Sequence, residues 1–179
     1  MVLAGGESRR FGSDKALAIF RGEPLLTHVI RGLSGFAQVV LTAKQPEKYA
    51  AFEVERVRDG HLSQTPLAGL AAGLSASRFE LVFACAADMP FAADDKLLQA
   101  LFEAIEGHDV AVPARQPLCS LWRRDPALNA AGPLLAMPNP PGPRALWPLL
   151  RTAHLDWPDG RPFLDADTPD DLRRLDEEA

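Results

Sequence analysis

The sequence is poor in cysteine and lacks any long apolar run. Its 179 residues include two cysteines, Cys85 and Cys119, too few for a disulfide framework. We expect both to be buried thiols. Apolar stretches are interrupted within about ten residues, too short to cross a bilayer, and no secretory apolar segment follows Met1. The four histidines have no metal-ligand spacing. These absences favour a cytoplasmic protein without a membrane or disulfide scaffold.

Positive charge is also in short supply. The net charge of -5 argues against a surface that coats nucleic acid, so any anionic ligand is expected to be small and bound in a cleft. A 47% hydrophobic chain of this length can bury one core. Because no repeat or linker divides it, we expect a single domain over residues 1–179.

Short apolar segments alternate with helical patterns, which is typical of α/β proteins with a parallel sheet. The expected strands are 2–4, 38–42, 54–57, 81–87, 110–113 and 118–122. The expected helices are 24–33, 66–75, 94–105, 127–136, 144–150 and 168–175, with a proline-rich loop at 137–143. Thr168 is expected to cap the last helix, with Pro169 at its first position.

The segment LAGGESRRFGSDKAL follows the first expected strand. Gly5 and Gly6 expose backbone amides to an anion, and Arg9, Arg10 and Lys15 supply charged donors, so the segment predicts a phosphate-binding loop. Its spacing matches neither the Walker A motif nor the dinucleotide fingerprint. A plain strand-to-helix connection with solvated charges is the alternative.

Acidic residues follow several expected strands. Asp88 comes just after strand 81–87, at the edge where open α/β sheets bind ligands. Magnesium takes one or two carboxylates plus phosphate oxygens, so Asp88 is a candidate metal ligand, with capping of the next turn as the alternative. Asp59, after an earlier strand, has both interpretations open. Asp165 and Asp167 alternate on an extended segment, which suits either a shared cation or the cap of the last helix.

Four segments resemble the molybdenum cofactor guanylyltransferases (MobA) in sequence and order: LAGGESRRFGSDKAL, TPLAGLAAGL, AADMPF and DADTPDDL. The resemblance implies the fold of the GT-A-like nucleotidyltransferases, an α/β Rossmann-like three-layer sandwich with a mostly parallel central sheet. The Pro-Leu-Ala-Gly segment points to the guanylyl branch. A cytidylyltransferase or sugar-phosphate nucleotidyltransferase of the same fold remains an alternative, as does a nucleotide-binding module without catalysis.

The resemblance also implies an activity and its residues. GMP would pass from GTP to the terminal phosphate of molybdenum-molybdopterin, with Mg²⁺ as cofactor, and the product would go to a target molybdoenzyme or its chaperone. The implied catalytic residues are Arg10 and Lys15, which grip the departing phosphates, and Asp88, which carries the metal. The implied nucleotide-binding residues are Leu3, Ala4, Gly5, Gly6, Lys15, Thr42, Asp59 and Asp88.

The chain departs from that family at several positions. Thr42 stands where an asparagine is common at the end of the second strand, and Thr65 where a glycine usually precedes Pro-Leu-Ala-Gly. Asp165 and Asp167 stand where some members of the family have asparagines, which adds negative charge beside an anionic substrate unless a further cation is present.

Two other expectations concern the chain start and the acceptor. The first strand is short, so we expect either a native chain that begins upstream of Met1 or a truncated, weak strand. The family comparison places the acceptor near 118–124 and the Asp165 segment. Arg123 and Arg124 then either pair with its phosphate or form a solvated surface pair.

Overall fold

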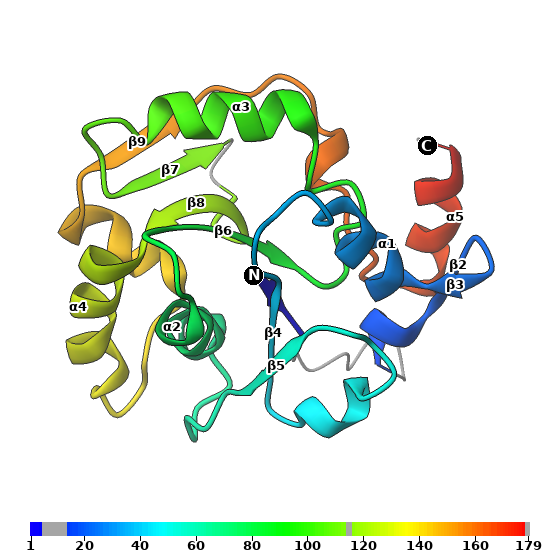
Figure 1. The fold of residues 1–179 in the computed structure, drawn as a ribbon, viewed down its shortest axis with the longest axis horizontal. Coiled ribbons are helices and arrows are strands. Elements are labelled where there is room, and N and C mark those ends of the chain that lie inside the picture. Colours follow the sequence, from blue (N-terminus) through cyan, green and yellow to red (C-terminus); the bar gives the residue numbers. More distant parts are fainter. Residues whose placement is uncertain (5–13, 114–115, 178–179) are drawn as a thin grey trace.

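A seven-stranded sheet forms the centre of the molecule (Figure 1). The computed structural model describes residues 1–4, 14–113 and 116–177. The strand order is β5-β4-β1-β6-β8-β7-β9, and β8 runs antiparallel to both of its neighbours. The strands are β1 (Val2–Leu3), β4 (Val40–Ala43), β5 (Glu55–Arg58), β6 (Leu81–Ala86), β7 (Val110–Pro113), β8 (Cys119–Arg123) and β9 (Thr152–Leu155).

Helices cover both faces of the sheet. On one face α1 (Leu25–Gly32) and α3 (Asp95–Ala104) pack with Phe83 and Cys85 of β6. On the other, α2 (Pro66–Ala76) and α4 (Arg124–Leu135) pack with Val82 and Ala84 of the same strand. Successive β6 side chains therefore enter opposite cores, as a strand buried on both faces requires. This arrangement confirms the α/β three-layer sandwich.

The short first strand occupies a central place in the sheet. β1 pairs in parallel with β4 on one side and with β6 on the other. Sheet hydrogen bonds continue past its assigned ends, because Ala4 N donates to Thr42 O (2.8 Å) and Ala87 N donates to Leu3 O (3.0 Å). Leu3 and Ala4 are thereby fixed at the carboxyl edge.

A hairpin and the last helix pack together beside the sheet around a small hydrophobic cluster. β2 (Ile19–Phe20) and β3 (Glu23–Pro24) are joined by Arg21 and Gly22, both with positive φ, as a type I′ turn requires. α5 (Pro169–Glu177) lies next to this hairpin in Figure 1, and its Leu175 is buried with Phe20. Four 3₁₀ helices complete the fold: η1 (Lys15–Leu17), η2 (Pro46–Tyr49), η3 (Pro143–Leu149) and η4 (Arg161–Phe163).

Most expected elements are present, with shifted ends. The β7 range is the one expected, and Asp94 caps α3 by accepting from Leu97 N (2.9 Å). The hairpin and β9 were missed. Pro24 belongs to β3 rather than to the helix, so that helix begins at Leu25. The helix expected over 144–150 is instead the 3₁₀ helix η3, which ends at Leu149. The two-residue strands of the hairpin are too short to show a periodic pattern.

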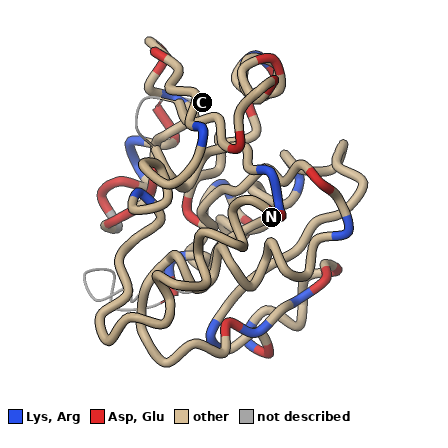
Figure 2. The backbone as a smooth tube through the Cα atoms, turned by 90° about the vertical axis from the view of Figure 1, so that its left-hand side faces the viewer, with Lys and Arg blue, Asp and Glu red and all other residues tan. Residues whose placement is uncertain are grey.

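The remaining composition-based expectations concern cysteines and charge. Cys85 and Cys119 are buried free thiols, as expected. They are opposite each other in the β6–β8 register, and burial raises the pKa of Cys85 to about 11. Along the visible backbone in Figure 2, basic and acidic segments are interspersed. None of the helices in the described part of the chain has the length and apolar character needed to cross a membrane.

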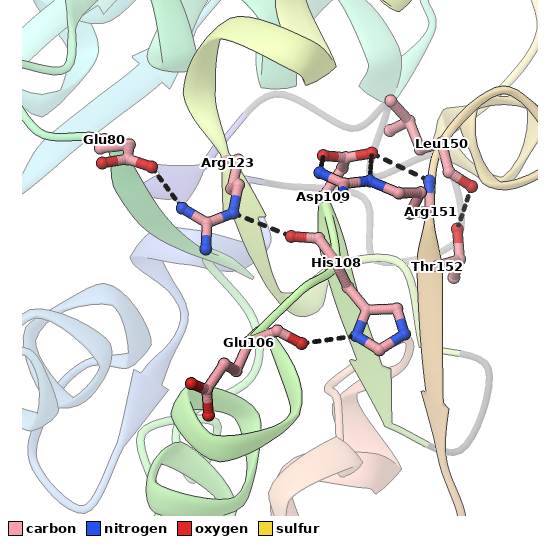
Figure 3. A network of polar contacts seen from close by, with 8 residues as sticks. All are labelled: Glu80, Glu106, His108, Asp109, Arg123, Leu150, Arg151 and Thr152. Carbon is pink, nitrogen blue, oxygen red and sulfur yellow. Dashed lines mark hydrogen bonds and ion pairs between the residues drawn. The ribbon is translucent and has the colours of Figure 1, made fainter.

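A two-pronged ion pair joins β7 to β9 at the far end of the sheet (Figure 3). Asp109 accepts from Arg151 Nη2 (2.7 Å) and Nε (3.0 Å), and also from the Arg151 backbone N–H (3.0 Å). These hydrogen bonds hold the pKa of Asp109 below its ordinary range.

Asp109→Asn is therefore expected to destabilise the protein at neutral pH but not in acid. Because the folded-state pKa is depressed, the stabilisation is present above the unfolded pKa of about 3.9 and is lost as pH falls through the folded value. Urea unfolding of both proteins from pH 7 to pH 3 measures the difference. A difference that stays constant over this range would contradict the assignment.

Candidate functional site

The carboxyl ends of β1, β4, β5 and β6 open into a cavity of about 700 Å³. In open α/β sheets this edge binds ligands where the strand order reverses, here between β1 and β6. The cavity is lined by Leu3, Ala4, Lys15, Thr42, Asp59 and Asp88 of the expected set, and by residues of 64–66, 116–118 and 141–145. Gly5, Gly6, Arg9 and Arg10 lie outside the described residues.

Asp88 lies two residues beyond the end of β6, largely buried at the cavity wall. Its Oδ2 is 3.5 Å from Lys15 Nζ. Burial raises the pKa of Asp88 more than the neighbouring ammonium lowers it, and the charge of Asp167 adds to the rise. The carboxylate is thus held in a place where a further positive charge would stabilise it.

Asp165 and Asp167 come to the same place from the other end of the chain. Asp167 accepts a hydrogen bond from Lys15 Nζ, and Asp165 lines the cavity. Burial raises the pKa of Asp165, and the charges of Asp88 and Asp167 raise it further. Two carboxylates therefore pair with Lys15, and the third, Asp165, lines the cavity and is influenced by their charges.

The α5 cap holds this acidic segment in place. Thr168 Oγ1 accepts from Asp171 N (3.3 Å), while Asp171 Oδ2 accepts from Thr168 N (2.7 Å), a reciprocal capping box. Thr168 therefore has the cap role expected for it. The segment serves the helix cap and the charge cluster together, so the two interpretations of this region are compatible.

Lys15 is positioned by the residue before it. Asp14 caps η1 by accepting from Ala16 N (3.1 Å), and its second oxygen accepts from Tyr49 Oη (2.8 Å). Partial burial alone lowers the Lys15 pKa, but Asp167 and Asp88 outweigh it, and the net shift is upward. Lys15 is therefore a firmly charged donor. The Tyr49 contact was missed because η2 carries no recognisable motif.

The cluster fits a magnesium ion bound together with phosphates. Among the described residues, no three carboxylate, imidazole or thiol groups are arranged to hold a metal by themselves. Magnesium needs only one or two carboxylates when phosphate oxygens and water fill its other positions. Burial raises the pKa values of Asp88 and Asp165, and the carboxylates nearby raise them further, so a bound cation would stabilise the ionised form of both side chains.

At the other end of the cavity, Asp59 is paired with a residue that sequence reasoning missed. Asp59 follows β5 and is 8% exposed; its Oδ2 lies 3.0 Å from Lys44 Nζ. Lys44 directly follows β4 and lines the cavity, whereas Thr42 is within that strand, 3.5 Å from Val2 O. The position of Lys44 just past the end of a strand was the feature of the sequence that could have indicated a residue of the site.

The threonine that precedes Pro-Leu-Ala-Gly fits without strain. Thr65 has φ -104° and ψ 135°, an extended conformation open to any residue. Its hydroxyl caps α2 by accepting from Leu67 N (3.3 Å) and donates to Pro141 O (2.7 Å). Eight residues on, Gly73 lets α2 approach the sheet, since a Cβ there would collide with Met1 Sδ and lie 3.0 Å from Thr42 Cγ2.

Arg123 and Arg124 lie at the opposite end of β6 from Asp88. Arg123 faces Leu81 across the sheet; it contacts Glu80 and donates through Nε to His108 O (2.9 Å; Figure 3). Arg124 is paired with Asp125 (2.8 Å). This placement favours the surface-pair interpretation for both.

Comparisons with known proteins agree with the observed fold. The family model for the MobA-like NTP transferase domain matches residues 1–158. A probable molybdenum cofactor guanylyltransferase from Natronomonas pharaonis is 32% identical, over 97% of this chain and 94% of that protein. The crystal structure of molybdopterin-guanine dinucleotide biosynthesis protein A from Archaeoglobus fulgidus has a TM-score of 0.81 at 27% identity, over 98% of this chain and 95% of that one.

Another relative matches over a shorter stretch. A probable molybdenum cofactor guanylyltransferase from Methanosarcina acetivorans is 36% identical over 125 residues, which are 63% of this chain and 55% of that protein. The match thus spans little more than half the length of that relative.

Proposed function

The chain belongs to the family of MobA-like NTP transferase domains, and from that membership we propose that it transfers GMP from GTP to the terminal phosphate of molybdenum-molybdopterin. Pyrophosphate is released and the guanine dinucleotide form of the cofactor is made. The observation that carries the proposal is the convergence of Lys15, Asp88 and Asp165 on a cavity at the carboxyl edge of the sheet. These residues come from distant parts of the chain.

For this reaction the protein needs mainly to align the two substrates and to supply positive charge. An oxygen of the acceptor phosphate attacks the α-phosphorus of GTP, and the bond to the β-phosphate oxygen breaks. Because the attacking group is already ionised, no general base is needed. The protein has to bring two anions together and neutralise the charge that develops on the departing pyrophosphate.

The described residues divide this work. Lys15, kept charged by its carboxylate neighbours, would bind the departing phosphates. Asp88 and Asp165 would hold Mg²⁺, which when bound supplies positive charge to the phosphate oxygens. Leu3 and Ala4, held by sheet hydrogen bonds, line the cavity and would contact the nucleotide there. We also propose that Gly5, Gly6 and Arg10, which lie outside the described residues, complete the phosphate site.

GTP with Mg²⁺ is expected to raise the unfolding temperature more than CTP, ATP or UTP at the same concentration. A ligand at a hundred times its dissociation constant stabilises the fold by about 2.7 kcal/mol. Differential scanning fluorimetry with each nucleotide, with and without Mg²⁺, measures this. Stronger protection by CTP would move the donor assignment to the cytidylyl branch, and protection by none of them would overturn the proposal.

A further inference from the structure

Lys44 contacts the loop that forms one wall of the cavity. This wall is the rim loop, defined as residues 59–65, between β5 and α2. Lys44 Nζ donates to the carbonyl oxygens of His61 and Ser63 (2.9 Å to Ser63) and lies 3.0 Å from Asp59 Oδ2. Two N–H groups of the ammonium thus donate to backbone carbonyls of the rim loop, and the ion pair with Asp59 adds a charged contact at the start of the same loop.

Asp59 is committed to the same loop. While its Oδ2 faces Lys44, its Oδ1 accepts from the backbone N–H of His61 (3.0 Å). Both oxygens of this buried carboxylate thus have partners that fix the start of the loop. The lysine and the aspartate act as one unit, and removal of either leaves a largely buried charge without its partner.

His61 ties the rim loop to the end of α4. Its Nδ1 accepts from Ser63 N (3.1 Å), so Nε2 carries the proton and donates to Leu135 O (3.0 Å). Thr65 makes a second such link, from its hydroxyl to Pro141 O (2.7 Å). Two side-chain bonds therefore join the rim loop to segment 135–141, and part of each forms the cavity wall.

The rim loop stands well away from the charge cluster. Asp88 follows β6 and Asp59 follows β5, three strand positions apart, which is on the order of 14 Å at a spacing of about 4.8 Å. Lys15 and Asp88 occupy the phosphate end of the cavity. The rim loop, with Gln64 and Thr65 at the wall, is left for the rest of the nucleotide.

We propose that Lys44 and His61 are positioning residues for the nucleoside part of the donor nucleotide. They hold the rim loop and Asp59 in the shape that contacts base and ribose, and they touch neither the transferred phosphate nor the metal. The proposal rests on the proposed function, since it takes the nucleoside triphosphate as donor. It gives Asp59 a role through the loop that it anchors.

The test compares two ligands, each with Mg²⁺: GTP and inorganic tripolyphosphate, which lacks base and ribose. Lys44→Met is expected to weaken GTP binding at least about tenfold, because a buried charge-assisted network is lost, while tripolyphosphate binding stays unchanged. Lys44→Arg is expected to recover part of the loss. Lys48→Met, which removes an exposed lysine of η2, is the matched control. Isothermal titration calorimetry on the full chain measures both affinities.

His61→Ala is expected to show the same split between GTP and tripolyphosphate, with His154→Ala on the exposed side of β9 as its control. Unchanged GTP affinity in the Lys44→Met protein would overturn the inference. Equal loss of both ligands would also overturn it, since that marks a general structural role. If the wild type prefers another nucleotide, the proposed donor is wrong, and the same comparison with that nucleotide still decides the role of Lys44.

Discussion

Asp88→Asn is expected to lower the rate of pyrophosphate release by about a thousandfold or more. The substitution weakens binding of the metal ion that would stabilise the reacting phosphates. Asparagine keeps the size of the side chain and one oxygen but removes the negative charge. Because burial already raises the pKa of this carboxyl, the neutral amide is tolerated and the fold is expected to be kept. Single-turnover measurement of pyrophosphate at saturating GTP reports the effect on chemistry.

The control is Asp95→Asn, an exposed carboxylate in the first turn of α3, away from the cavity lining. It is expected to leave the rate unchanged. Raised Mg²⁺ is expected to recover part of the activity of Asp88→Asn, because Asp165 still faces the same space. A variant at position 88 with near wild-type turnover would remove this residue from the catalytic set.

Lys15→Met is expected to cost about a hundredfold to a thousandfold in turnover, the range seen when one preorganised donor to a developing charge is removed. The loss has two causes. The departing phosphates lose a cation, and Asp88 and Asp167 lose the ammonium that lies between them. Lys15→Arg keeps the charge and is expected to retain part of the activity, although a guanidinium is larger than the ammonium it replaces.

The matched control for this prediction is Lys96→Met, an exposed lysine on α3. Thermal unfolding of each variant separates loss of chemistry from loss of fold. If Lys15→Met keeps both turnover and GTP affinity, the phosphates are held by other groups, and the role given to Lys15 is wrong.

Sequence reasoning reached the charge cluster because its members sit in motifs. Asp88 follows an unmistakable buried strand, and Lys15 and Asp165 belong to segments with a recognisable order along the chain. That the Asp165 segment packs against Lys15 depends on α5, which is held by the β2–β3 hairpin. The strands of this hairpin have two residues each, so they show no periodic pattern in the sequence. The Arg-Gly pair at the turn was the one local indication of it.

The contacts between Lys44 and the rim loop could not be predicted from the sequence for a different reason. Lys44 acts on backbone carbonyls seventeen and nineteen residues away, and carbonyls carry no sequence signal. At Thr65 the sequence suggested a difficulty that the structure does not show. The family usually has a glycine there, and a glycine indicates a backbone conformation that other residues rarely adopt. The extended conformation found there removes that requirement, and the threonine adds a cap and a tether.

The most direct test of the account is pyrophosphate release by the full chain with GTP, Mg²⁺ and molybdenum-molybdopterin, followed by identification of the product. The account predicts pyrophosphate and the guanine dinucleotide in equal amounts, with neither formed when GTP or the acceptor is left out. Binding of GTP without pyrophosphate in the presence of a competent acceptor would contradict it.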